Sequence, residues 1–317
     1  DFCLSRGLGD VYKRQIYNLD NIKKVSHNKS DKITFETNEF IPITSDCMFK
    51  TIFGRKENIK FPCKLLSYIL DMSYEDLLNN LKFTKNETGK EKKEDSNYRQ
   101  DLVVTLDDIS INIEMNNNSS EEIRERNISY MMRLREDRKN KKNYNQVIQV
   151  NLNNYCYKED DTIRRDFLIS STDNVILTNK IVMIDIYLPN IKKKMYNKGI
   201  KALSEMERFL LIGLEENKQK ALEYVGDDIV MKDLEERISD WTLSDDLRES
   251  YDKEWALKDQ AKREGVIQGI EQGIEQGMKQ GKSEIINKFL ESGMTVEEIS
   301  KITDITIEEI QHIKSCN

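Results

Sequence analysis

The chain has 317 residues, of which 38% are apolar and 34% charged, and its formal net charge is −7. This length is enough for one large domain or two modest ones. The acidic balance argues against a uniformly basic coat for nucleic acid, so DNA binding would require a local basic cluster.

The cysteine and histidine counts exclude further classes of site. Only two histidines are present, which nearly excludes a histidine-based metal site or a Ser-His triad. The five cysteines are scattered without a zinc-binding spacing and fit a reducing cytoplasm. No apolar run approaches the roughly 20 residues that span a membrane, and no secretory signal is visible.

The first 40 residues are expected to lie outside the functional core. Residues 5–15, SRGLGDVYKRQ, back-translate into a transposon-type sequencing adapter, so we interpret residues 1–15 as an assembly artefact. Residues 16–40 are polar and rich in Lys and Asn, which predicts a disordered lead-in.

Helices are predicted next. Ser45 or Asp46 can cap a helix that ends at Gly54, and capping is the favoured role for Asp46. Residues 58–72 form a second amphipathic pattern, and residues 74–81 a short helix or turn. The apolar stripe of the first helix comprises Met48, Phe49, Ile52 and Phe53.

Residues 98–116, YRQDLVVTLDDISINIEMN, predict a β-hairpin around which the chain is organised. With Asp107 and Asp108 as a two-residue loop, Leu106 pairs with Ile109, and the register of every other pair follows. One face is then wholly apolar. The other face places Asp101 opposite Glu114.

Two carboxylates at opposed positions need a physical reason. Their Cβ atoms would lie about 5 Å apart, where like charges are destabilising. Either one carboxyl holds a proton, or a hard divalent cation such as Mg2+ lies between them. The alternative is that both acids point into solvent on an exposed sheet face.

The segments after the hairpin complete the predicted sheet. Residues 121–137 predict a helix with Arg126, Tyr130 and Arg133 on one face. Tyr130 is expected in the core, and Arg126 can pair with Glu122. Residues 147–152 predict a central strand, followed by strands at 166–171 and 181–188, the last ended by Pro189. This order predicts an α+β fold, with a central mixed sheet flanked by helices.

From residue 201 onward the pattern is helical. We expect a core domain over 41–200, a helical subdomain over 201–262, a glycine-repeat helix or linker over 263–281, and a small helix-turn-helix-like unit over 282–317. Glycine recurs every fourth residue from Gly265 to Gly281. It predicts either close helix packing, as in a homodimer through the C-terminal helices, or a flexible linker. Thr295 and Glu298 form a capping-box pattern.

These motifs, in this order, resemble a known family. The aspartate, the hairpin and the Ile-Glu pair ending at Glu114 are similar to the core of the PD-(D/E)XK nucleases. IPITSDCMFKTIFG at 41–54, INIEMN at 111–116, ERNISYMM at 125–132, VIQVNLNNY at 147–155 and the glycine tail more closely resemble its recombination-promoting nuclease and transposase family. The resemblance extends over most of the chain from residue 41.

The resemblance implies a restriction-endonuclease-like core and a Mg2+- or Mn2+-dependent endonuclease acting on double-stranded DNA. Asp101, Glu114 and the main-chain carbonyl of Met115 would hold the metal, and Asp46 is the candidate for the acid that some related nucleases carry on the first helix. The family has Lys or Gln two residues after the glutamate, where this chain has Asn116. Asn116 would then have to position the water, or a basic residue from elsewhere would replace the lysine.

The basic residues expected to bind nucleic acid are Arg126, Arg133, Lys139 and Lys141. The run at 133–142 that contains most of them is equally explained as a solvated helix end. The absent lysine and the acidic balance support an alternative: a catalytically impaired nuclease fold that acts as a nucleic-acid or protein binding module.

Overall fold

The computed structural model describes residues 39–84, 100–136 and 146–315. Residues 1–38 lie outside this range, as do Lys139 and Lys141. Among the described residues, no helix is both long and apolar enough to cross a membrane. The described chain divides into two compact units, one up to Glu254 and one from Trp255 onward.

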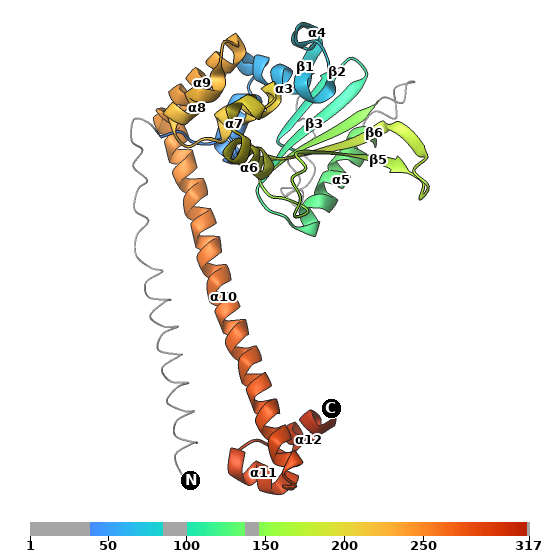
Figure 1. The fold of residues 1–317 in the computed structure, drawn as a ribbon, viewed down its shortest axis with the longest axis vertical. Coiled ribbons are helices and arrows are strands. Elements are labelled where there is room, and N and C mark those ends of the chain that lie inside the picture. The colour runs from blue at the N-terminus through green and yellow to red at the C-terminus, as the bar shows by residue number, and fades with distance from the viewer. Residues whose placement is uncertain (1–38, 85–99, 137–145, 316–317) are drawn as a thin grey trace. The chain divides into compact units, whose positions relative to one another are not determined.

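The first unit is built on one mixed six-stranded sheet with the order β1-β2-β3-β4-β6-β5 (Figure 1). The pairs β3–β4 and β4–β6 are parallel, and the others are antiparallel. β4 is therefore central, as predicted. The strands are β1 (Leu81–Phe83), β2 (Leu102–Leu106), β3 (Ile109–Asn116), β4 (Val147–Asn153), β5 (Arg164–Ser170) and β6 (Ile176–Tyr187).

The β2–β3 hairpin confirms the predicted register. Leu106 pairs with Ile109, and Leu102 pairs with Ile113. Asp107 takes a left-handed φ of 46°, which Asp tolerates better than most residues and which a tight two-residue hairpin loop requires. Alternate side chains of β3 point to opposite faces of the sheet because of the strand's own geometry, and the two-residue loop fixes which residue of β2 each one pairs with.

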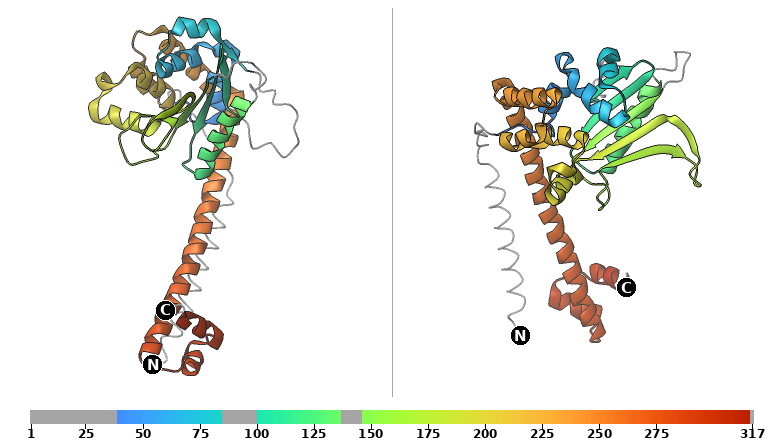
Figure 2. Two further views of the ribbon diagram at one scale, coloured as in Figure 1. Left: turned by 90° about the vertical axis from the view of Figure 1, so that its right-hand side faces the viewer. Right: turned by 45° about the horizontal axis from the view of Figure 1, so that its top comes forward.

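Helices cover both faces of the sheet. The apolar face of β2 and β3 packs into a core with α2, α3 and α7, while α5 contacts β3 and β4 on the opposite face. Figure 2 (left) shows α5 and the N-terminal helices on opposite sides of the sheet. Helices of this unit are α2 (Asp46–Phe53), η1 (Lys56–Asn58), α3 (Lys60–Leu70), α4 (Tyr74–Asn80), α5 (Glu121–Glu136), α6 (Leu188–Lys198), η2 (Ile200–Ala202), α7 (Glu205–Leu214), α8 (Lys218–Val225) and α9 (Ile229–Thr242).

Three local predictions need correction. Ser45 caps α2 by accepting a hydrogen bond from the Met48 N–H, so Asp46 is a first-turn residue and not the cap. Pro189 does not simply end β6: α6 starts at Leu188, and proline is well tolerated in the first turn of a helix. The edge strand β1 was missed because three residues carry too little alternation to be recognised.

The second unit contains the end of α10 (Asp245–Glu291), α11 (Val296–Thr303) and α12 (Ile307–Ser315). Its core is formed by Ile286, Ile299 and Ile310. The Thr295–Glu298 capping box is confirmed, with both reciprocal hydrogen bonds present. The five repeat glycines all lie in α10, and no described atom lies within 4 Å of a Cβ placed on any of them. Packing along this ridge in a homodimer stays a prediction.

Candidate active site

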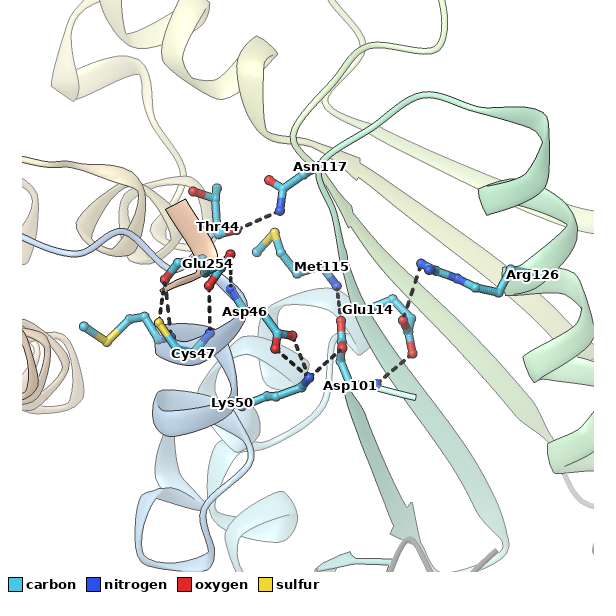
Figure 3. Close-up of polar contacts among 12 residues, drawn as sticks. Thr44, Asp46, Cys47, Lys50, Asp101, Glu114, Met115, Asn117, Arg126 and Glu254 are labelled. Carbon is cyan, nitrogen blue, oxygen red and sulfur yellow. Dashed lines mark hydrogen bonds and ion pairs between the residues drawn. The ribbon is translucent and has the colours of Figure 1, made fainter. Parts of the chain in front are cut away.

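Asp101 and Glu114 lie side by side where the β2–β3 hairpin opens. The backbone N–H of Asp101 donates a 2.9 Å hydrogen bond to Glu114 Oε1, and the Met115 N–H donates a 3.1 Å hydrogen bond to Asp101 Oδ2 (Figure 3). Each acid is thus held through one oxygen by the backbone of the neighbouring strand. The second oxygen of each carboxylate, Asp101 Oδ1 and Glu114 Oε2, is directed toward a cationic side chain.

Glu114 is buried and Asp101 is largely buried, so the alternative that both acids point into solvent is wrong. The Glu114 side chain is 2% exposed and the Asp101 side chain 15%. Burial, followed by the nearby charge of Asp101, raises the pKa of Glu114 to about 8. Burial also raises the pKa of Asp101. Ionising both carboxyl groups is therefore unfavourable, and a bound cation would relieve that cost.

Lys50 of α2 reaches this pair from one side. Its Nζ lies 3.8 Å from Asp101 Oδ1 and 2.6 Å from Asp46 Oδ1 (Figure 3). Burial by itself lowers the pKa of Lys50. The hydrogen bond and charge of Asp46, together with the charges of Asp101 and Glu114, outweigh burial and raise that pKa above its ordinary value. Lys50 is therefore charged at neutral pH.

The start of α2 is fixed to the hairpin and to α10. Asn117 follows β3, and its side-chain amide donates a 2.7 Å hydrogen bond to the carbonyl of Thr44. Glu254 accepts hydrogen bonds from the backbone N–H groups of Asp46 and Cys47, at 3.0 and 3.4 Å (Figure 3). A carboxylate at a helix N-terminus is favourable. These contacts hold the helix that carries Lys50 beside the two acids.

Arg126 of α5 reaches the pair from the other side. Its guanidinium lies 4.0 Å from Glu114 Oε2 and donates a 3.2 Å hydrogen bond to Asn116 Oδ1. The Asn116 amide in turn donates a 3.0 Å hydrogen bond to Asn153. Arg126 Nε is buried and has no hydrogen-bond partner among the described residues. Tyr130 is 1% exposed, which confirms its predicted place in the interior.

A buried row of amides continues from Glu114 across the sheet. Asn112 donates to Glu114 Oε1 at 3.0 Å and to Gln149 Oε1 at 2.9 Å. Gln149 donates to Asn151 at 2.8 Å, and Asn151 to Asp185 at 2.7 Å. Burial raises the pKa of Asp185. This row was missed, although polar residues at alternate positions of β3 and β4 were its signal in the sequence.

A hollow of about 250 Å³ lies beside Asp101. It adjoins the β2 side of the acid pair and includes a second lysine. Such a hollow leaves Asp101 accessible from one side. Its lining residues are Gly54, Lys56, Phe83, Thr84, Asp101, Leu102 and Val103.

The donor atoms suit a small hard cation. In the part of the chain that the structure describes, no group of three or more His, Cys, Asp or Glu is arranged to hold a metal ion. Mg2+ in proteins is commonly bound through one or two carboxylates and retains several water ligands. The Asp101–Glu114 pair, with its oxygen donors and raised pKa values, fits that requirement.

The remaining predicted residues are dispersed. Arg133 is exposed on α5, and Lys139 and Lys141 lie outside the described residues. The Met115 side chain packs into the core, so only its main chain faces the acid pair. The basic residue that would replace the absent lysine is not identified by the sequence, and Lys50 is not among the residues expected to bind nucleic acid. The only sequence signal for Lys50 was its i,i+4 spacing from Asp46.

Comparison with known proteins gives one match. The family model described as PD-(D/E)XK nuclease family transposase matches residues 43–264, which include α2, the hairpin and the whole sheet. No curated protein and no solved structure matches the chain. The matched segment is more than half of the chain and contains both buried carboxylates. The chain therefore belongs to the PD-(D/E)XK nuclease family transposases.

Proposed function

We propose that this protein is a divalent-metal-dependent endonuclease that hydrolyses phosphodiester bonds in double-stranded DNA. The observation that carries the proposal is the buried Asp101–Glu114 pair. A fold does not retain two adjacent carboxyl groups in its interior for stability, because ionising each costs desolvation energy and the two charges repel each other. Such arrangements are concentrated at functional sites.

Asp101 Oδ1 and Glu114 Oε2 would be the metal-binding oxygens, because the other oxygen of each carboxylate accepts a backbone hydrogen bond. The Met115 carbonyl is the third candidate ligand. In a strand, the N–H and carbonyl of one residue point the same way, and the Met115 N–H points to Asp101. A Mg2+ or Mn2+ ion held by these oxygens would lower the pKa of bound water and offset charge on the phosphate.

The residues around the acids prepare the site for a phosphodiester. The Asn112 amide and the Asp101 N–H hold Glu114 in one orientation. The Arg126 side chain is 34% exposed, and a guanidinium matches the geometry of phosphate oxygens. In hydrolysis the oxygen of water bonds to phosphorus, and the bond to the leaving sugar oxygen breaks with its electron pair. The leaving oxygen takes a proton from solvent, and the attacking water loses one to solvent.

Asn116 is better suited to a supporting role than to direct contact with water. Its amide oxygen and nitrogen are already engaged by Arg126 and Asn153. It therefore holds Arg126 beside Glu114. Arg133, Lys139 and Lys141 remain proposed contacts for the DNA backbone. A role in transposition or recombination is proposed from the family alone.

Nicking of supercoiled plasmid by the full chain, with Mg2+ or Mn2+, tests this function. We expect the parent to nick, and the isosteric variants Asp101→Asn and Glu114→Gln to lose at least about 100-fold in rate, because each removes one ligand charge. Asp108→Asn is the matched control: it changes an exposed acid of the same hairpin and should nick at the parental rate.

The contrary outcomes are distinct. If the parent is silent with either metal while it is folded and binds DNA, the enzyme proposal fails and the binding-module alternative takes its place. If the parent nicks and both variants nick equally well, hydrolysis takes place elsewhere and the assignment of Asp101 and Glu114 fails.

A further inference from the structure

The position two residues beyond Glu114 carries no cation in this chain, but a cation reaches the acid pair from another element. Lys50 lies on α2, and its Nζ is 3.8 Å from Asp101 Oδ1. Asn116, the residue at the expected position, is 1% exposed and takes part in a neutral amide contact with Asn153. The acid pair therefore has an ammonium group beside it, and the residue that supplies it is distant from Glu114 in the sequence.

We propose that Lys50 is a catalytic residue of this site, supplying from α2 the ammonium that contacts a non-bridging oxygen of the scissile phosphate. The inference rests on the proposed function. Asp46 is a positioning residue in this scheme, because it holds the Lys50 ammonium at 2.6 and 2.8 Å through its two carboxylate oxygens.

The charge state of Lys50 defines what it contributes. Its Nζ lies 2.6 Å from Asp46 Oδ1 and 3.8 Å from Asp101 Oδ1, so it acts as a hydrogen-bond donor and a positive charge rather than as a base. Charge that develops on the phosphate oxygens would be stabilised by this donor, which is preorganised in a partly desolvated site. No proton is transferred to or from Lys50.

The geometry allows Lys50 to exchange Asp46 for a phosphate. The side chains of Lys50 and Asp46 are 46% and 56% exposed, and ion pairs at such exposure are weak. The four-carbon stem of lysine is flexible, and the ammonium donates three hydrogen bonds. The helix itself stays in place, because Ser45 caps it and Glu254 accepts from its first N–H groups. Only the end of one side chain has to move.

Lys50 could be a catalytic residue or only a counterion of the two acids, and the two roles predict different effects when its charge is removed. A counterion that only offsets the two acids would, when removed, affect folding stability. A catalytic ammonium beside a metal site would, when removed, slow cleavage. Removal would also strengthen cation binding, because a positive charge 3.8 Å from a ligand oxygen repels an incoming metal ion.

The test compares Lys50→Ala, Lys50→Gln and Lys50→Arg with the parent in three measurements on the full chain. These are the single-turnover nicking rate, the Mn2+ affinity by titration calorimetry, and the melting temperature. Lys60→Ala is the matched control, because Lys60 is a lysine of the adjacent helix paired with a different aspartate, Asp233.

We expect Lys50→Ala and Lys50→Gln to nick about 100-fold more slowly and to bind Mn2+ about three- to tenfold more tightly, with an unchanged melting temperature. Lys50→Arg should recover part of the rate. A slow rate with tighter metal binding is a combination that loss of structure would not produce.

Two results would overturn the inference, and they separate it from the function on which it rests. If the parent nicks and Lys50→Ala nicks at the rate of Lys60→Ala, the inference alone fails. If the parent does not nick with either metal, the proposed function fails and the inference fails with it.

Discussion

Ile113 and Glu114 are consecutive residues of β3 and are buried to the same degree, with exposures of 0% and 1%. Ile113 points into the apolar core against α2, α3 and α7. Glu114 points to the opposite face, where it meets Asp101, Asn112 and Arg126. The comparison between these two faces shows that burial by itself does not determine whether a residue stabilises the fold.

The two faces differ in the sign of their energetic contribution. Burial removes the apolar surface of an isoleucine from water, and it stabilises the fold by a few kcal/mol. A buried carboxylate loses its hydration and is compensated only if partners or a cation replace it. The apolar face of β3 therefore stabilises the sheet, and the polar face opposes folding until a ligand binds. Substitutions on each face and a metal titration test this difference.

The largest effect on stability is expected on the apolar face. Ile113→Ala should lower the free energy of unfolding by about 2–5 kcal/mol, because it leaves a cavity between the sheet and its helices. Ile113→Val should lower it by only about 1 kcal/mol. Urea denaturation followed by near-ultraviolet circular dichroism measures both. Nicking by folded Ile113→Val at the parental rate would show that this face serves the fold alone.

A smaller effect of opposite sign is expected on the polar face. In the unfolded chain Glu114 ionises near its ordinary pKa of 4.5, whereas in the folded chain its pKa is about 8. The folded protein therefore holds more protons at this group between these values, and the contribution of Glu114 to the stability of the metal-free protein is fullest below pH 4.5 and falls as pH rises toward 8. Glu114→Gln removes this fall and should raise the melting temperature at pH 8 by about 5 °C.

Calorimetric melting in EDTA from pH 5 to pH 8.5 measures that difference. Glu121→Gln, which changes an exposed glutamate at the start of α5, should follow the parental curve. If the melting temperatures of the parent and of Glu114→Gln change with pH in the same way, the pKa of Glu114 is not raised in the folded protein.

The difference between the faces also explains what could be predicted from the sequence. Alternation along residues 102–113 determined the register of the hairpin, and the register placed Asp101 opposite Glu114. Both predictions depend on local geometry that a strand pair imposes. The Thr295–Glu298 box was predicted for the same reason, since its partners are three residues apart.

Features that depend on packing between distant segments were not predictable. Alternating polar residues on β3 and β4 are compatible with an exposed face, and only the position of α5 reveals that Asn112, Gln149 and Asn151 are buried. Lys50 was missed because its approach to Asp101 requires α2 to pack beside the end of the hairpin. The Asn117–Thr44 hydrogen bond joins those segments, and no sequence periodicity encodes it.

The most direct test of the central claim is a calorimetric titration of the metal-free protein with Mn2+ near pH 7.5. If the buried pair is a metal site, the parent should bind one ion per chain and release protons, because the metal displaces protons held by the raised pKa of Glu114. Asp101→Asn and Glu114→Gln should each weaken binding by about 100-fold. Unchanged stoichiometry and affinity in both variants would show that Asp101 and Glu114 do not bind the metal ion.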